Sequence, residues 1–205
     1  MDSTYHHGSL REALLAEGRR LLAEEGPAAV TLRELARRTG VSHAAPSRHF
    51  ADRDALLAAL AAEGFDELTA DLRRSAENDD LEDRLTSYAR AHVRFAIENG
   101  PLVALMFARK PLPGEPDAEA AARFYALGAE LLGEAPGEPV GPMPYVLAGT
   151  LEGIGALVVA GRLAPDRVDA VVDEAVSMLL PRVREQLARR DGGAGSVGGG
   201  AGVGQ

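Results

Sequence analysis

The sequence predicts an all-α protein of about nine helices, with a small N-terminal helical domain over residues 1–60 and a larger helical domain over residues 61–190. Three observations favour this fold class. Apolar residues recur at intervals of three and four, which is the helical period. Aromatic residues make up only 4% of the chain, and alternating runs typical of strands are almost absent. Glycine and proline pairs also separate segments of helical length.

Two capping boxes mark the first helices. "SLRE" at 9–12 predicts that the first helix begins at Ser9, because a serine and a glutamate three residues later can satisfy each other's free backbone N–H groups. Gly26-Pro27 ends this helix. "TLRE" at 31–34 has the same form and predicts a second, short helix through Arg38.

A turn and two further helices complete the N-terminal domain. Gly40 is expected to end the second helix, and Ser42 can cap a third that reaches about Phe50. Pro46 then lies in or just beyond the first turn of this third helix, where a missing N–H costs little. A fourth helix is predicted over 52–74.

The larger domain follows the acidic stretch "ENDDLED". Its predicted helices are separated by glycine- and proline-rich breaks and cover 81–98, 101–110, 117–133, 143–161 and 166–188. In the last fourteen residues eight are glycine, and such a segment has no side chains with which to build a core. We therefore expect residues 191–205 to form a disordered tail.

Composition permits a nucleic-acid-binding module without requiring one. The chain has 205 residues, no cysteine and a net charge of −9, so disulfides and thiolate metal sites are excluded. Residues 1–60 are balanced, with eight arginines against eight acids, and the excess of acids lies in 61–205. Because phosphate binding needs local cations, an N-terminal DNA-binding module on an acidic body is compatible with this charge.

The stretch 31–50, "TLRELARRTGVSHAAPSRHF", predicts a short helix, a glycine turn and a second short helix. Leu35 and Ala36 form a small apolar face where two short helices can cross closely, and Gly40 can adopt the left-handed conformation of the turn. This is the supersecondary unit that enters the major groove of DNA. The alternative is a structural helical hairpin with no ligand, since helix pairs that carry arginines are common.

Residues 11–60 resemble the N-terminal domain of TetR-family transcriptional regulators, with the helix-turn-helix domain over about 9–60 and its motif at about 30–49. The matching positions are Leu14-Leu15, Leu21-Leu22, Gly26, Thr31, Leu35-Ala36, Gly40-Val41-Ser42, His49-Phe50, Arg53 and Leu56-Leu57. The rest of the chain resembles the family in its helix layout more than in its residues.

Three positions depart from the family pattern. Glu17-Gly18 replaces a usual alanine pair, and Glu152-Gly153 stands where some members have a histidine before the glycine. Ser47 replaces a usual tyrosine, and this departure concerns DNA contact directly. Serine is too short to reach the phosphate that a tyrosine hydroxyl would reach, unless the helix lies closer to DNA.

The resemblance implies a bacterial cytoplasmic regulator that binds a double-stranded DNA operator and is associated with the nucleoid while bound. It implies no cofactor and no metal. Hydroxyl groups and arginines would hold phosphates, and the start of the recognition helix would face base edges. The implied DNA-binding residues are Thr31, Arg33, Ser42, His43, Ala44, Ala45, Ser47, Arg48, His49 and Arg53. The alternative for each arginine is a solvated surface charge, and for His49 a histidine that packs beside Phe50.

The larger domain would carry dimerisation and effector binding. Gly149 and Gly153 give a small-residue face to helix 143–161, and 166–188 carries a broad apolar stripe, so these helices predict a homodimer interface. Their alternative is intramolecular core. A small-molecule effector of unknown identity would contact His92, Phe95, Met106, Phe107, Phe124, Tyr125, Tyr145 and Glu152, although ordinary core is the alternative for each.

Other functions fit the sequence less well. No membrane association is expected, because the longest apolar run, 145–161, is short for a span and contains Glu152. No nucleophile–base pair or H-E-x-x-H motif is found, so we do not expect an enzyme. The Gly-rich "GIGALV" has no strand before it and lacks the last glycine of a nucleotide-binding loop. The principal alternative is a helical ligand-binding or interaction protein that has lost specific DNA binding.

Overall fold

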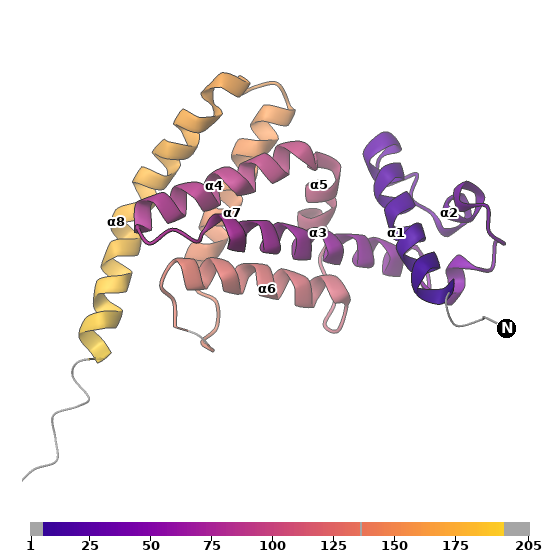
Figure 1. Ribbon diagram of the computed structural model, residues 1–205, viewed down its shortest axis with the longest axis horizontal. Helices are drawn as coiled ribbons and strands as arrows, with labels where there is room; N and C mark the ends of the chain where they lie inside the picture. Colours follow the sequence, from indigo (N-terminus) through magenta and orange to yellow (C-terminus); the bar gives the residue numbers. More distant parts are fainter. Residues whose placement is uncertain (1–5, 136, 195–205) are drawn as a thin grey trace, which may run out of the picture. The chain divides into compact units, whose positions relative to one another are not determined.

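The computed structural model describes residues 6–135 and 137–194, and every regular element within them is helical (Figure 1). This confirms the all-α prediction. The elements are α1 (His6–Glu25), α2 (Leu32–Thr39), η1 (Pro46–Arg48), α3 (Arg53–Ser75), α4 (Leu81–Glu98), α5 (Gly100–Ala108), α6 (Pro116–Leu131), α7 (Pro142–Val159), η2 (Pro165–Arg167) and α8 (Val168–Ala194), where η denotes a 3-10 helix.

Six of the eight α-helices begin and end within two residues of their predicted bounds, and α1 and α8 are longer. Helix α1 begins at His6, so the prediction that Ser9 starts it was wrong. A capping box favours a helix start, but without a proline in 6–8 nothing prevents the preceding residues from extending the helix. Helix α8 continues to Ala194, and residues 195–205 of the predicted tail lie outside the described residues.

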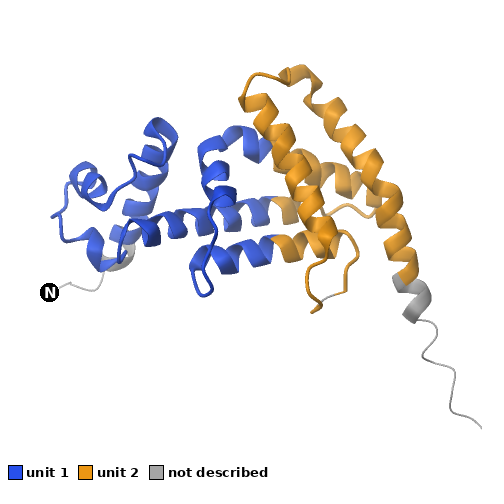
Figure 2. Ribbon diagram, turned by 180° about the vertical axis from the view of Figure 1, so that it is seen from behind, with its two compact units in different colours: residues 1–71, 94–124 blue, residues 72–93, 125–205 orange. Residues whose placement is uncertain are grey.

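The described chain forms two compact units (Figure 2). One contains residues 6–71 and 94–124, and the other contains residues 72–93, 125–135 and 137–194. The division runs through α3, α4 and α6, so each of these helices contributes residues to both units. We call the first the N-terminal unit and the second the C-terminal unit.

The core of the N-terminal unit is built from leucines on α1, α2 and α3. Leu14, Leu21, Leu35 and Leu56 have no exposed surface, and α1 packs against both α2 and α5. A Cβ atom on Gly64 would lie 2.6 Å from the Met106 sulfur, so α3 and α5 approach too closely there for a larger residue. This packing fixes the base from which α2 and the following turn project.

In the C-terminal unit α7 packs against α8. Leu151 of α7 and Val172 of α8 are buried, whereas Val146, Leu157 and Val159 of α7 are about half exposed. Helix α7 is long and apolar enough to cross a membrane and only 33% buried, but a single such helix is weak evidence because core helices meet the same test. The unit therefore presents an apolar helix face that no described residue covers.

Candidate nucleic-acid interface

The first half of the predicted motif folds as expected. Thr31 adopts an extended conformation and its Oγ1 accepts a hydrogen bond of 3.2 Å from the Glu34 backbone N–H, so it caps α2. Gly40 ends α2 in the left-handed conformation, with φ of 71°. The Val41 N–H then donates to the Ala36 carbonyl over 3.1 Å, which closes the Schellman-type turn.

The second half differs from the predicted recognition helix. His43 and Ala44 lie in a turn closed by the Ala45 N–H on the Ser42 carbonyl (2.9 Å), and only Pro46–Arg48 is helical, as the 3-10 helix η1. The prediction of an α-helix capped by Ser42 was therefore wrong. Proline has no N–H to donate to residue 42, and in a segment of about eight residues the loss of one bond leaves too few to hold an α-helix.

Two buried residues, four positions apart, anchor this short segment. Pro46 and Phe50 are buried, and η1 packs against α2, whose Leu35 and Ala36 have no exposed surface. The side chains between these anchors face outward. The exposed members of the predicted DNA-binding set are Arg33, Ser42, His43, Ala44, Ser47 and Arg48, while Thr31, Ala45, His49 and Arg53 are partly exposed.

Two arginines of this segment form no hydrogen bond or ion pair with the described part of the chain. Arg33 and Arg48 are exposed and make no hydrogen bond or ion pair with any residue that the structure describes. Guanidinium groups in this state are available to bind phosphate oxygens without breaking an existing contact. Both project from the segment that carries the exposed Ser42, His43 and Ser47.

The guanidinium of Arg53 already donates hydrogen bonds within the chain. Its Nε donates to the Val30 carbonyl over 2.9 Å and its Nη2 donates to the Pro27 carbonyl over 2.5 Å. These bonds tie the start of α3 to the loop between α1 and α2. The guanidinium therefore has fewer N–H groups left for DNA than the sequence alone suggests.

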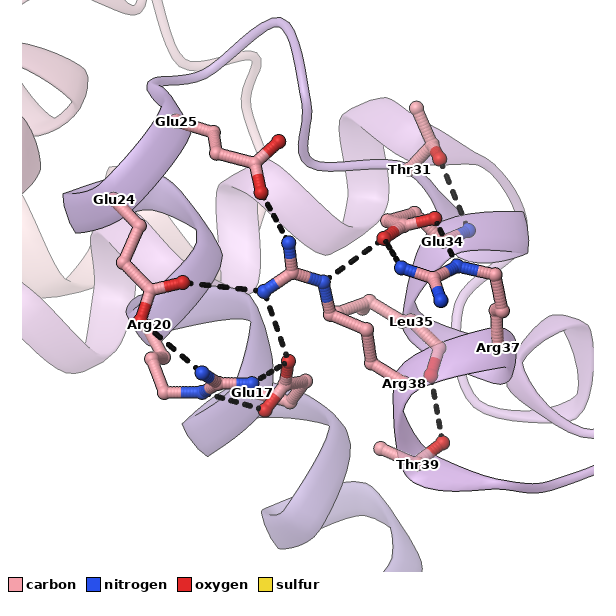
Figure 3. A network of polar contacts seen from close by, with 10 residues as sticks. All are labelled: Glu17, Arg20, Glu24, Glu25, Thr31, Glu34, Leu35, Arg37, Arg38 and Thr39. Carbon is pink, nitrogen blue, oxygen red and sulfur yellow. Dashed lines mark hydrogen bonds and ion pairs between the residues drawn. The ribbon is translucent and has the colours of Figure 1, made fainter.

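The remaining arginines of α2 form a network with α1 (Figure 3). Arg38, with a side chain only 15% exposed, lies within ion-pair distance of Glu17, Glu24, Glu25 and Glu34. Arg37 also donates to Glu34, over 2.5 and 2.9 Å. Hydrogen bonds from Arg37, and then from Arg38, lower the pKa of Glu34 to about 2. Glu34 therefore binds these arginines instead of completing the predicted capping box.

This network was absent from the sequence prediction. Arg37 and Arg38 follow the same pattern of helical arginines as Arg33, and no local signal points to their contacts with α1. Only the fold brings Glu24 and Glu25, at the end of α1, beside Arg38. The spacings of Arg37 and Arg38 from Glu34, three and four residues, were the available hint of pairing within α2.

The predicted effector residues of the N-terminal unit lie in its core. Phe95, Met106 and Phe124 are buried. Phe107 and Phe124 pack edge to face with ring centroids 5.9 Å apart, and both also contact the ring of Phe65. Such packing is typical of a filled aromatic core.

The other four predicted effector residues belong to the C-terminal unit. The rings of Tyr125 and Tyr145 lie 4.3 Å apart, and burial raises the pKa of Glu152, on the same helix as Tyr145, to about 7. Burial, followed by the charge of Glu152, raises the pKa of Tyr125 to about 12. His92 is fully buried near Tyr88, and this burial lowers its pKa to about 4, so its imidazole is neutral at pH 7.

The C-terminal unit also contains a cavity whose lining residues the sequence did not indicate. It is lined in part by Arg73, Arg84, Tyr88 and Glu130, which come from three different helices. Among the described residues, no group of three or more histidines and acids is placed to hold a metal ion.

Comparison with known proteins agrees with the geometry of residues 31–50. Residues 14–60 match the family model of bacterial regulatory proteins of the tetR family. The chain is 33% identical over 90 residues to the HTH-type transcriptional repressor Rv3405c of Mycobacterium tuberculosis, an alignment that covers 44% of this chain and 48% of that protein. The chain thus spans about half the length of this relative.

Solved structures extend the likeness over most of the chain. A protein of unknown function from Rhodococcus sp. RHA1 is 39% identical with a TM-score of 0.72, covering 86% of this chain and 96% of that one. A tetR-family regulatory protein from Rhodococcus RHA1 shares the fold at 18% identity with a TM-score of 0.62, covering 85% and 96%. Together with the family model over 14–60, these findings show that the chain belongs to the TetR family of bacterial regulatory proteins.

Proposed function

We propose that this protein is a transcriptional repressor that binds a palindromic DNA operator as a homodimer and is released from it by a small-molecule effector. The observation that carries the proposal is the exposed pair Arg33 and Arg48, which have no partner among the described residues. They lie on a segment that buried Pro46 and Phe50 hold in place. Preformed, unpaired cations are what a phosphate backbone requires.

Residues 1–60 form the proposed DNA-binding domain. Arg33 and Arg48 bind phosphates, helped by the hydroxyls of Thr31, Ser42 and Ser47. The hydroxyl of Thr31 accepts from the Glu34 N–H and still has its own hydrogen to donate. His43 and the methyl groups of Ala44 and Ala45 face the base edges, from a turn instead of an α-helix. His49 supports the phosphate contacts, and Arg53 acts chiefly by fixing the preceding loop.

The proposed dimer forms through α7 and α8, within the effector-binding and dimerisation domain at 61–190. Val146, Leu157 and Val159 of α7 and Met178 of α8, the last 75% exposed, provide apolar surface that needs a partner. Cβ atoms on Gly149 and Gly153 would meet nothing within 4 Å in the chain, so another helix can approach closely there. A symmetric pair is also what a palindromic site requires, since one copy covers half of it.

The glycines of α7 provide a test of this interface. Gly149→Leu adds a side chain where the subunit has open space, so the fold of the subunit is preserved while close approach of a second α7 is blocked. We expect the variant to be monomeric by light scattering with an unchanged helical circular dichroism spectrum. Glu119→Leu, at an exposed position of α6 outside both interface helices, also adds apolar surface and serves as the control. A dimeric Gly149→Leu protein contradicts the interface.

Release would follow from differential binding. An effector can free the operator only if it binds the released conformation of the dimer more tightly than the DNA-bound one. In the cytoplasm the protein would be associated with the nucleoid while it is bound to its operator. The buried residues predicted to contact the effector are proposed to transmit this change, because many of them form the packed core.

Operator binding is tested by fluorescence anisotropy with the promoter region beside the gene. We expect tight, sequence-selective binding whose affinity falls about a hundredfold or more between about 50 and 200 mM salt, as for a dimer whose arginines neutralise about four phosphates. A scrambled duplex of equal length is the control. Equal affinity for both duplexes would favour the alternative, a helical ligand-binding protein that has lost specific DNA recognition.

A further inference from the structure

A cavity of about 350 Å³ lies within the C-terminal unit. This volume is near the lower end of the range of about 300–1,000 Å³ that is usual for small-molecule sites. Its polar wall includes Arg73 at the end of α3, Arg84 and Tyr88 one turn apart on α4, and Glu130 on α6. None of these residues belongs to the predicted effector set.

Arg84 carries the strongest indication of a ligand. Its Nε is buried and donates to no oxygen among the described residues, and the residue lines the cavity. A buried guanidinium N–H without an acceptor is costly, and an oxygen atom of a bound molecule would remove that cost. Arg73 likewise forms no ion pair with any residue that the structure describes.

The local charge in the cavity is opposite to that of the whole chain. The charged residues of its lining are two arginines, Arg73 and Arg84, and one glutamate, Glu130, while the chain as a whole carries −9. The surplus of one positive charge matches a monoanion. Tyr88 adds a neutral hydrogen-bond donor, because burial, followed by the charge of Tyr125, raises the pKa of its phenol.

The remaining residues of the lining are apolar or glycine. Leu127 and Leu131 lie on one face of α6, and Leu187 of α8 borders the same space. A Cβ atom on Gly133 would clash with Leu187, so the α6–α7 loop and α8 close tightly on this side. A ligand that matches both kinds of lining residue therefore has a charged head and a hydrocarbon body.

We propose that this cavity binds a small amphipathic carboxylate, with its carboxylate on Arg84 and Arg73 and its hydrocarbon body against Leu127, Leu131 and Leu187. The cavity requires no residue of the DNA-binding domain. The role of this ligand as the effector rests on the proposed function, whereas its binding does not.

The test is calorimetric titration of the full chain, without DNA, with four eight-carbon probes: octanoate, octyl phosphate, octylammonium and 1-octanol. We expect octanoate to bind about tenfold or more tightly than octylammonium. Arg84→Gln should weaken octanoate binding by about tenfold or more and change 1-octanol binding less than about twofold. The matched control is Arg167→Gln, an exposed arginine of η2 outside the cavity, which should leave octanoate binding unchanged.

Arg73→Gln provides a second variant, because Arg73 is exposed and its loss should not affect folding. We expect a weaker effect in the same direction. The proposal is overturned if octanoate does not bind, if octylammonium or octyl phosphate binds more tightly, or if neither arginine variant weakens octanoate binding. Since no DNA is present, a chain that binds octanoate but no operator is distinguished from one that binds operator but no octanoate.

Discussion

Two groups of arginines lie close together in the N-terminal unit, and they differ in what surrounds them. On the outer surface of residues 31–50, Arg33 and Arg48 are exposed and have no partner among the described residues. On the side of α2 that faces α1, Arg38 is enclosed by four glutamates. The first pair can bind an external anion at no cost to the fold, whereas Arg38 can do so only by giving up existing ion pairs.

This difference shows why a count of arginines does not locate a DNA-binding surface. Arg33, Arg37 and Arg38 all lie on one eight-residue helix. Their contacts separate them into one residue available for binding and two that hold α2 in place. The comparison makes two predictions. Substitutions of Arg33 and Arg48 should affect DNA binding alone, and substitution of Arg38 should affect stability.

The largest expected effect is on DNA binding by an Arg33→Ala, Arg48→Ala double variant. Each residue is proposed to bind one phosphate per subunit, so a dimer would lose four contacts. We expect operator affinity to fall about a hundredfold or more, and the slope of log affinity against log salt to become shallower by about 3–4. The measurement is anisotropy across a salt series, with thermal denaturation as the check on folding.

Arg37→Ala is the matched control, because Arg37 is equally exposed on the same helix but pairs with Glu34. It should change operator affinity less than about threefold. If the control weakens operator binding as much as the double variant does, the presence or absence of an intramolecular ion pair does not determine which arginines bind DNA.

The second prediction concerns Arg38→Met, which removes the shared cation from the glutamate network. The four carboxylates would then share only Arg20 and Arg37, and Glu25 would lose its ion pair with Arg38. We expect the melting temperature to fall by several degrees, while Arg48→Met leaves it unchanged. Differential scanning calorimetry measures both. Equal melting temperatures would show that the network contributes nothing to the packing of α2 on α1.

Acid should remove the same stabilisation in the wild-type protein. The pKa of Glu34 is lowered in the fold, to about 2 from 4.5. Its contribution is therefore present above the unfolded pKa and lost as pH falls from about 4.5 towards 2. The Arg38→Met variant should lose less stability than wild type over that interval, since it has less of the network to lose.

The pKa of Glu152 is shifted in the opposite direction to that of Glu34. Glu152 has no cation paired to it among the described residues. Burial raises its pKa to about 7 from 4.5, so the folded state binds more protons than the unfolded state between these values. Stability should therefore fall as pH rises through this interval. Because Glu152 is partly exposed, we expect Glu152→Gln to be more stable than wild type by only about 1 kcal/mol near pH 8. Urea denaturation at about pH 5 and pH 8 measures this, and an equal gain at both values contradicts the assignment.

The parts of the molecule that sequence predicted well are those that neighbouring residues determine. Thr31 caps α2 and Gly40 ends it, because both depend on backbone groups within five residues. The recognition segment was predicted less well. Pro46 was expected to be tolerated in a first helical turn, but the segment is too short to form an α-helix once that hydrogen bond is missing.

Contacts between distant residues could not be predicted. Glu24 lies 14 residues from Arg38, and Leu187 of the cavity comes from a different helix than Arg84. Side-chain periodicity assigns each of these residues to a helix face but does not say which faces meet. The network and the cavity therefore appear only once the helices are packed.

The smallest predicted effect is the change in operator affinity on substitution of Ser47, which lies beside Arg48. This residue is exposed between buried Pro46 and free Arg48, and related proteins usually have tyrosine there. Ser47→Tyr should strengthen operator binding about threefold without changing sequence preference, because a phenol can reach a phosphate that serine does not. Ser47→Phe separates the hydroxyl from the ring. If phenylalanine strengthens binding as much as tyrosine does, or if tyrosine weakens binding, Ser47 does not face a phosphate, and the surface around Arg48 meets DNA in another way.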